Sequence, residues 1–566
     1  MQTTLTTTML LRNLISNLKP DISRLKIKNI SLDSRKVKKG DLFVSIRGNS
    51  FDGNNFINEA ILKGAKVIVY SGKIKINKKA IFIKVKDTRE ILAKLSSKYY
   101  KKKPKNIVAV TGTNGKTSIS DFFNQIFLLQ NKKVGFIGTL GVKKNRAIKK
   151  RNLTTLDSLE LNKDLEEIKK NGIENVIIEA SSHGLKQKRL NFIKFKAGIF
   201  SNLSHDHLDY HKNMSDYFES KLILFNKLLN KKATIITDSE IKEFKKIKKI
   251  QKMRKLKLLA IGHESKVFKI TNHKIYKNFQ FLEIKYKNKL YKLRINLFGS
   301  IQIKNLLMAI LASKVCGLKI ENIFKNIDKI KSVNGRLQHI RTLSNKSKVF
   351  IDYAHTPDAL ENAILSLREH FQKKITIIFG CGGERDQGKR KLMGMVAKKY
   401  CEKIYVTDDN PRNEDPKKIR NEIIKNIKFK NYFNIGNRTE AIKTAVMNAE
   451  HGEIILVAGK GHEKEQIYKN KIISISDSQI IKKLKIKTKK LSNINFTFLQ
   501  NKKILESILK NTKVGNFHGL AIDSRAVNKG NIFLTLKGKN NDGIKFIPKA
   551  LKKGAKYIIS SKQIHN

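Results

Sequence analysis

The stretch NIVAVTGTNGKTS, residues 106–118, decides the fold of the largest part of the chain. Its first half is an apolar run typical of a buried strand, and a glycine-rich turn then leads into a helical pattern. Gly112 and Gly115 would let backbone N–H groups approach a phosphate, while Lys116 offers a positive charge and Thr117 a hydroxyl for Mg²⁺. The match to the Walker pattern is partial because its first glycine is absent. The stretch nevertheless predicts a nucleotide-binding loop.

Further apolar runs alternate with helical stretches on the C-terminal side of this loop. The expected strands lie at 106–111, 174–180, 197–202 and 233–237, and in a second series at 348–352, 374–379, 403–407 and 453–458. Such alternation is typical of mostly parallel sheets with crossover helices. We therefore expect two successive α/β domains after a basic linker, KKKPK at 101–105.

A repeat flanks these domains. Residues 31–66 align without gaps with residues 521–556, and 17 of the 36 positions are identical. Each copy has the pattern strand, glycine turn, strand, loop, helix, strand. We therefore expect a small α/β module at each end, which makes four domains in 566 residues.

Composition excludes several classes of protein. Hydrophobic residues make up 40% of the chain, which is enough for packed cores and argues against overall disorder. The three cysteines fit neither a disulfide scaffold nor a metal-binding pair, and no apolar run is long enough to span a membrane. The net charge of +71 is spread over the whole chain, which favours a compositional bias and leaves anionic partners open. A cytoplasmic enzyme that binds neither membrane nor nucleic acid is expected, and a monomer.

Polar side chains follow two of the expected strands. Glu179 ends one strand and is followed by Ser181 and His183, while residues 205–211 after the next strand hold three His and two Asp. Since the carboxyl ends of parallel strands form a ligand crevice, both groups should meet the nucleotide-binding loop. Metal ligands beside the phosphates are the predicted outcome, with a hydrated polar loop as the alternative.

Eight motifs in order resemble those of the Mur ligases, ATP-dependent enzymes that form amide bonds in peptidoglycan precursor synthesis. The motifs are TGTNGKT (111–117), EASSHGL (179–185), NLSHDHLDYH (202–211), YFESK (217–221), DYAHTPDALE (352–361), FGCGGERDQGKR (379–390), DDNPR (408–412) and AGKGHE (458–463). The resemblance implies an α/β fold of three domains: a UDP-muramoyl-binding domain (1–103), a central P-loop domain (104–338) and a Rossmann-like ligase domain (339–488). A partial second N-terminal-like module (491–566) follows.

The resemblance also implies roles for individual residues. Catalysis would involve Lys116, Lys221, His207, Glu179 and Arg336. ATP would be bound by Gly112, Thr113, Asn114, Gly115, Lys116, Thr117, Ser118, Asn305 and Asp352. Mg²⁺ would be held by Thr117, Glu179, His207 and Lys221, the last as a carbamate, which is an anion able to hold Mg²⁺ beside the phosphates. Near adenine the chain has Gln302 where the family has Asn, and the linker has Asn334 where Pro is usual.

The two other substrates would be bound elsewhere. The UDP-muramoyl dipeptide would be bound by Leu32, Ser34, Asn49, Ser50, Phe51, Thr154, Thr155, Ser181, Gln187 and Arg189. The incoming amino acid would be bound by Arg385, Asp409, Asn410, Pro411, Arg412, Gly459 and Glu463, with Glu463 placed to take the distal ammonium. Arg412 offers a bidentate fork for a second carboxylate, so the DNPR form resembles ligases that add meso-diaminopimelate as the third residue of the peptide.

Three alternatives stay open: a lysine-adding Mur ligase, a folylpolyglutamate-synthetase-like ligase, and a basic nucleic-acid-binding ATPase. The last 76 residues resemble the start of a second Mur ligase, the D-alanyl-D-alanine-adding one, and repeat Asp33, Ser34 and Arg35 as Asp523, Ser524 and Arg525. No second GKT follows, so this part would not ligate. A truncated fusion, a frameshift product and a working module are all compatible with it.

Overall fold

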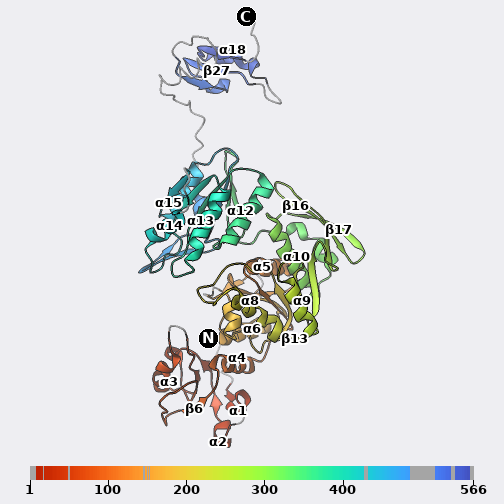
Figure 1. The fold of residues 1–566 in the computed structure, drawn as a ribbon, viewed down its shortest axis with the longest axis vertical. Helices are drawn as coiled ribbons and strands as arrows, with labels where there is room; N and C mark the ends of the chain where they lie inside the picture. The colour runs from red at the N-terminus through yellow and green to blue at the C-terminus, as the bar shows by residue number, and fades with distance from the viewer. Residues whose placement is uncertain are drawn as a thin grey trace. The chain divides into compact units, whose positions relative to one another are not determined.

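The computed structural model describes residues 8–16, 18–48, 51–144, 147–149, 151, 153–425, 427, 431–484, 517–536 and 542–560. The chain forms two compact units, Met1–Leu484 and Lys485–Asn566. Figure 1 shows their helices and strands in chain order. Among the described residues, no helix is both long enough and apolar enough to cross a membrane.

The first unit begins with a small parallel sheet of order β3-β4-β5-β6. Its strands are β3 (Ile30–Ser31), β4 (Leu42–Val44), β5 (Val67–Tyr70) and β6 (Ile81–Lys84), with helices α3 (Ile57–Leu62) and α4 (Thr88–Tyr99), the 3₁₀ turns η1 (Ser34–Lys36) and η2 (Gly53–Phe56), and at the N-terminal end β1 (Met9–Leu10), α1 (Leu11–Leu14), α2 (Pro20–Ser23) and β2 (Lys26–Ile27). Alternate strand residues enter two separate cores, so both faces of the sheet are covered.

The central part is an eleven-stranded sheet of order β10-β9-β8-β11-β7-β12-β13-β14-β15-β16-β17. Its strands are β7 (Asn106–Thr111), β8 (Gly135–Gly138), β9 (Gly141–Lys144), β10 (Ala147–Lys149), β11 (Asn175–Glu179), β12 (Phe195–Phe200), β13 (Leu229–Asp238), β14 (Lys257–Gly262), β15 (Phe268–Ile275), β16 (Gln280–Tyr286) and β17 (Lys289–Ile295). In the sheet order from β8 to β15, each strand pairs in parallel with its neighbour. The pairs beyond β8 and beyond β15, at the two ends of the sheet, are antiparallel.

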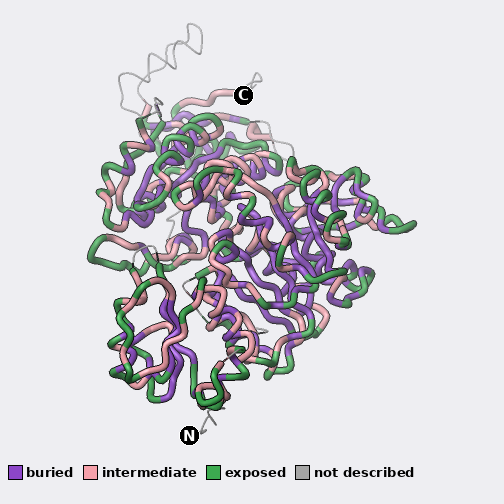
Figure 2. The backbone as a smooth tube through the Cα atoms, turned by 60° about the horizontal axis from the view of Figure 1, so that its bottom comes forward, coloured by how far each residue is buried: buried purple, intermediate pink, exposed green. Residues whose placement is uncertain are grey.

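Two layers of helices cover this sheet. The helices are α5 (Lys116–Leu128), α6 (Ser158–Lys170), α7 (Ser182–Lys186), α8 (Met214–Ile223), α9 (Phe244–Met253), α10 (Ser300–Val315) and α11 (Ile320–Phe324). Apolar residues of α5 and α10 share one core with the strands, while those of α6, α8 and α9 share the core on the other face. Buried residues gather in the interior, and exposed ones lie mostly at the periphery (Figure 2).

The third part of this unit is a six-stranded sheet of order β18-β19-β23-β20-β21-β22. Its strands are β18 (Gln338–Thr342), β19 (Lys348–Ile351), β20 (Ile375–Phe379), β21 (Lys403–Val406), β22 (Tyr432–Asn434) and β23 (Ile454–Val457); the helices are α12 (Pro357–Phe371), α13 (Gly388–Tyr400), α14 (Pro416–Ile424), α15 (Arg438–Met447) and α16 (Asp477–Lys483), and a hairpin is formed by β24 (Glu465–Tyr468) and β25 (Lys471–Ser474). All pairs are parallel except β18 with β19.

The described part of the second unit repeats the small module. It contains β26 (Gly519–Ala521), η5 (Ser524–Ala526), β27 (Asn531–Leu534), η6 (Gly543–Phe546), α18 (Ile547–Lys552) and β28 (Tyr557–Ile559). The three strands pair in parallel in the order β26-β27-β28.

The α/β fold predicted from the sequence is confirmed, and the eight expected strands correspond to β7, β11, β12, β13, β19, β20, β21 and β23.

Candidate active site

A cavity of about 310 Å³ lies where the central sheet and the third part of the first unit meet. From the central sheet, β7, β11 and β12 are parallel neighbours, so the loops that follow them open at the same edge. From the third part come the loops after β20, β21 and β23. The sequence motifs that follow these strands therefore share one cavity.

The loop between β7 and α5, which the sequence predicts to bind phosphate, forms one side of the cavity. Gly112 and Gly115 both have positive φ, +144° and +86°, and a Cβ atom on Gly115 would lie 2.6 Å from the Asn305 amide oxygen. Glycine is therefore required for the close approach of this loop to α10. Lys116 begins helix α5, and its ammonium donates to the carbonyls of Gly112 (2.9 Å) and Thr113 (2.7 Å). An anion at this helix N-terminus would be stabilised by the helix dipole and by this ammonium.

Glu179 is the fully buried carboxylate of the cavity. It accepts hydrogen bonds from the hydroxyls of Thr117 (3.2 Å) and Thr139 (2.9 Å) and from the Thr139 N–H (3.1 Å). Burial raises the pKa of Glu179, and the positive charge of Lys116 opposes that rise. A further cation at this position would favour the ionised form.

Lys221 lies on α8 and is only 1% exposed. Its Nζ donates to the Gly112 carbonyl at 2.8 Å and lies 4.1 Å from the centre of the Tyr217 ring. Burial, followed by the nearby charge of Lys116, lowers the pKa of Lys221 well below its usual value. This environment favours the neutral amine over the ammonium.

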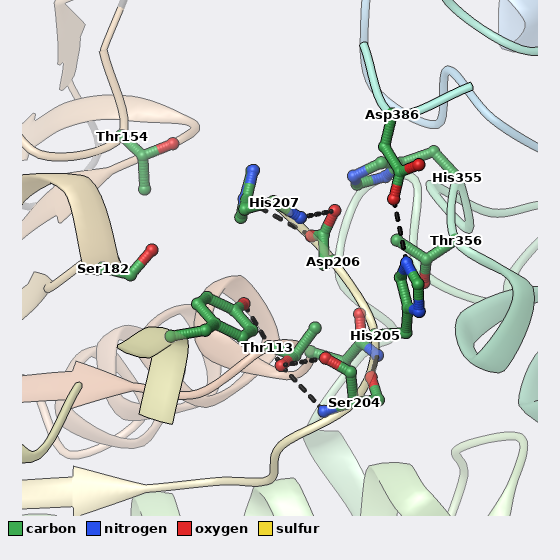
Figure 3. A network of polar contacts seen from close by, with 12 residues as sticks. Thr113, Thr154, Ser182, Ser204, His205, Asp206, His207, His355, Thr356 and Asp386 are labelled. Atoms are coloured by element: carbon green, nitrogen blue, oxygen red, sulfur yellow. Dashed lines mark hydrogen bonds and ion pairs between the residues drawn. The ribbon is translucent and has the colours of Figure 1, made fainter. Parts of the chain in front are cut away.

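The loop after β12 supplies the histidine cluster. His205 Nε2 lies 2.9 Å from a carboxylate oxygen of Asp386, which follows β20, so this contact joins the central and third parts (Figure 3). His207 lines the cavity, and burial lowers its pKa to about 3, so its imidazole is neutral. Below it, the Thr113 hydroxyl donates to the carbonyl of Ser204 at 3.2 Å and ties the loop to the phosphate side.

These residues fit a magnesium ion. Thr117 and Glu179 place a hydroxyl and a carboxylate in contact at 3.2 Å beside the phosphate loop, and oxygen is the ligand that Mg²⁺ prefers. Within the described ranges, no group of three or more His, Cys, Asp or Glu could hold a metal ion by itself. A few side chains completed by substrate phosphates are the usual arrangement for Mg²⁺ in phosphoryl-transfer sites.

A second cavity, of about 80 Å³, adjoins the phosphate loop. Its walls include Asn114, Gly115, Ser118, Gln302, Asn305, Arg336 and Asp352. Both Asp352 oxygens accept backbone N–H groups, from Leu337 (2.6 Å) and Ala354 (2.7 Å), and burial raises the pKa of this carboxyl. Arg336 extends from the junction towards the phosphate side, where a guanidinium nitrogen lies 3.3 Å from the Thr117 hydroxyl. The predicted ATP residues therefore line two adjoining cavities, with the exception of Gly112. The Gly112 carbonyl instead accepts a hydrogen bond from Lys221.

The residues predicted for the UDP-muramoyl dipeptide are spread over three places. Thr154 and Ser181 line the large cavity. Thr155, Gln187 and Arg189 form a neighbouring cluster, in which Arg189 donates to the Thr155 carbonyl (2.6 Å) and the Gln187 amide (2.7 Å).

The remaining predicted residues of this group belong to the small N-terminal sheet. Leu32 is partly buried, Ser34 is buried in η1, and Phe51 is 75% exposed. Asn49 and Ser50 lie outside the described residues.

The residues predicted to bind the incoming amino acid belong to the third part. Arg385, Asp409, Asn410, Arg412, Gly459 and Glu463 all line it. Arg412 has a φ of +52° and donates from one nitrogen to the carbonyls of Gly383 (2.7 Å) and Asn410 (3.3 Å). Burial and the neighbouring charge of Arg385 lower the pKa of Arg412. Pro411, the other predicted member, is not part of the cavity wall.

Several cavity residues were not assigned roles from the sequence. They include Thr139, Asp206, Tyr217, Tyr353, His355, Asp386 and Lys389. All but Thr139 lie inside the motifs quoted above, which was the available signal. Thr139 follows β8, and only the pairing of β8 with β11 brings it beside Glu179.

Comparisons with known proteins agree with this geometry. Residues 110–313 match the Mur ligase middle domain, residues 335–461 match the Mur ligase glutamate ligase domain, and residues 26–100 and 516–565 both match the catalytic domain of the Mur ligase family. A curated relative from Rickettsia montanensis, named UDP-N-acetylmuramoyl-L-alanyl-D-glutamate--2,6-diaminopimelate ligase, is 39% identical over 82% of this chain and 98% of its own.

Two solved structures extend the comparison. A structure titled as the same diaminopimelate ligase superposes with a TM-score of 0.62 at 29% identity, covering 84% of this chain and 98% of its own. Folylpolyglutamate synthase from Mycobacterium tuberculosis superposes with a TM-score of 0.56 at 14% identity over 66% of this chain and 91% of its own, which shows a shared fold alone. Because a relative is matched along nearly its full length and each Mur ligase domain finds its own stretch of sequence, this chain belongs to the Mur ligase family.

Proposed function

We propose that this chain is an ATP-dependent ligase that joins meso-diaminopimelate to UDP-N-acetylmuramoyl-L-alanyl-D-glutamate. The observation that carries the proposal is the shared cavity, where Lys116 of the phosphate loop and the buried Lys221 of α8 face an amino-acid pocket with two arginines. The names of the diaminopimelate ligases described above support the same assignment. A monomer is proposed as the active form.

The reaction would proceed in two steps. A carboxylate oxygen of the D-glutamate attacks the γ-phosphorus of ATP, the bond to the bridging oxygen breaks, and ADP leaves. The amine nitrogen of the incoming amino acid then attacks the acyl carbon, and inorganic phosphate leaves as the amine gives up a proton. The chain contributes mainly positioning and compensation of negative charge.

Each side of the cavity has its own part in these steps. Lys116 would neutralise the terminal phosphates, and Arg336 would reach them from the junction of the two parts. Mg²⁺ bound by Thr117 and Glu179 would supply further positive charge beside the phosphate oxygens. The neutral imidazole of His207 is available beside them. Asn305 and Asp352 would contact adenosine, while Thr154 and Ser181 would orient the muramoyl peptide.

The environment of Lys221 supports its proposed carbamylation. In its neutral form, which burial favours, the Lys221 nitrogen can attack the carbon of CO₂, forming an N–C bond and releasing one proton, and the product is an anion beside Lys116. Replacing Lys221 with Ala should lower turnover by about 100-fold or more, and a small carboxylic acid such as acetate should restore part of it. The exposed Lys227, replaced with Ala, is the control. Activity of the Lys221 variant close to that of wild type would contradict the proposed carbamate.

The proposed substrate is tested by ADP release from purified enzyme with the UDP-muramoyl dipeptide and either meso-diaminopimelate or L-lysine. We expect kcat/KM to be about 100-fold or more higher for meso-diaminopimelate, because a guanidinium that pairs with the distal carboxylate is left unpaired by L-lysine. The Lys116→Met variant should release no ADP with either amine. Comparable efficiencies for the two amines would favour the lysine-adding alternative.

A further inference from the structure

Behind the amino-acid side of the cavity lies a buried cation for which the mechanism above has no role. Lys460 follows β23, and its exposed fraction is 0%. Its neighbours Gly459 and Glu463 line the cavity, whereas Lys460 itself lies behind the wall. A fully buried ammonium carries a large desolvation penalty and requires compensation by nearby acceptors.

Three acceptors surround the Lys460 ammonium. Its Nζ lies 2.6 Å from the carbonyl of Glu465, 3.1 Å from a carboxylate oxygen of Glu463 and 3.2 Å from the amide oxygen of Asn410. An ammonium has three N–H groups, so these contacts use its full donor capacity. Lys460 therefore has no donor left for a substrate, and its effect must pass through the residues that it holds.

Two of these acceptors belong to the proposed amino-acid pocket. The Asn410 amide oxygen also accepts the N–H of Ile467 at 3.0 Å, and the Asn410 nitrogen donates to Glu463 at 3.1 Å. A flipped amide would place its NH₂ group against both donors, so the ammonium and the backbone N–H together fix the amide orientation. The orientation of Asn410 towards the cavity thus depends on Lys460.

Glu463 is held by the same network. One carboxylate oxygen accepts from Lys460 and Asn410, and the other accepts from the Tyr353 hydroxyl at 3.2 Å. Hydrogen bonds to both oxygens thus fix the direction in which the Glu463 carboxylate faces the pocket. An incoming amine would then meet a carboxylate of fixed direction.

We propose that Lys460 is a positioning residue of the amino-acid pocket, which holds Asn410 and Glu463 in the arrangement that receives the amine substrate. This inference rests on the proposed ligase function. It assigns Lys460 no part in phosphoryl transfer, because none of its three contacts reaches the phosphate side.

The test separates the two steps of the reaction in the full-length enzyme. Lys460→Met should raise the KM for meso-diaminopimelate by about 10- to 100-fold, because two polar groups of the pocket lose their fixed direction. The rate of ADP formation in a single turnover, measured with the UDP-muramoyl dipeptide and no amine, should stay within about twofold of wild type. Lys460→Gln keeps a donor of similar length and should show a smaller rise in KM.

Lys464→Met is the matched control, because Lys464 is exposed in the same loop and should leave both measurements unchanged. An unchanged KM for the amine in Lys460→Met would overturn the inference, and so would an equal loss of the amine-independent turnover in soluble Lys460→Met and Lys460→Gln. If wild type turns over no amine substrate at all, the proposed function itself fails, which is a distinguishable result.

Discussion

The two copies of the small module share nearly the same hydrogen bonds although they lie at opposite ends of the chain. Asp33 caps η1 and pairs with Arg35, as Asp523 caps η5 and pairs with Arg525. The N–H of Gly40 donates to the Gly64 carbonyl at 2.9 Å, and the corresponding bond from Gly530 to Gly554 is 2.7 Å. The residues that the copies share therefore include those that form these caps and backbone hydrogen bonds, which we call the shared frame.

The differences concern side chains around the serine of each Asp–Ser–Arg turn. Ser34 donates to Glu59 at 2.6 Å, which leaves the lone pairs of its hydroxyl oxygen able to accept a hydrogen bond. The second copy has Lys549 at the position of Glu59, so Ser524 has no carboxylate there. The comparison teaches that the shared Asp–Ser–Arg sequence reports the fold, whereas a binding role depends on what surrounds the serine.

The largest effect is expected where the shared frame is broken. Gly64 and Gly554 have φ of +96° and +87°, and a Cβ atom would lie 2.8 Å from Lys39 Cα in the first copy and 2.9 Å from Lys529 Cα in the second. Replacing either with Ala should lower the local unfolding free energy of its own module by about 1 to 3 kcal/mol, through backbone strain and the close contact. Hydrogen exchange of the amides in β4 and β27 measures this.

Gly452→Ala is the control for strain alone, because Gly452 also has a positive φ of +72° but no heavy atom within 4 Å of the added Cβ. Its effect should be smaller than those of the other two glycines. Effects of similar size in the two modules would support a common frame, and a large effect in one alone would contradict it.

The next effect should separate the copies. Ser34→Ala removes one polar contact proposed for the UDP-muramoyl dipeptide, so its KM should rise about tenfold with little change in kcat. Ser524→Ala, its matched counterpart, should leave ligation unchanged. Steady-state ADP release at varied UDP-muramoyl dipeptide concentration provides the measurement. A rise in KM from Ser524→Ala would show that the second copy takes part in binding this substrate.

Much of the fold was predictable because its signals are local. The β7 strand, the glycine loop and helix α5 follow one another in the sequence, and the eight predicted strands were found within a few residues. The 3₁₀ turns after Asp33 and Asp523 were not predicted, because they depend on single side-chain caps. The predicted strands are continuous apolar runs, whereas β15, β16 and β17 alternate apolar with polar residues, as half-buried strands do, and they were therefore missed.

The candidate site was predictable only in part, for a physical reason. Lys221 and Glu179 belong to recognisable motifs, but the depressed pKa of Lys221 comes from burial that no sequence pattern specifies. Thr139 reaches Glu179 through strand pairing, and Lys460 contacts Asn410 across 50 residues of sequence. Contacts between distant segments depend on the order of strands in a sheet, which composition and periodicity leave undetermined.

Replacing the aspartate that both copies share should lower the stability of the two modules by similar and smaller amounts. The hydrogen bond with Arg525 lowers the pKa of Asp523 to about 2, so this stabilisation is present above about pH 4 and is lost as the pH falls towards 2. Asp33→Asn and Asp523→Asn should each weaken their own module slightly, because both pairs are largely exposed. Hydrogen exchange should give the same difference from wild type at pH 7 and pH 5; a difference that disappears at pH 5 would contradict the assignment.

The smallest effect is expected from removing the second copy altogether. The described residues of 517–560 have their own sheet and core, and the cavity residues all lie between Thr113 and Glu463, within the first unit. A chain ending at residue 490 retains the contact of Arg341 with the Leu484 carbonyl, which joins α16 to β18 at 2.6 Å. Its kcat/KM for ligation should therefore stay within about twofold of the full chain, since no interaction made in the transition state is removed. A loss above about tenfold in soluble enzyme would mean that the second module, despite lacking a phosphate loop, acts on the first.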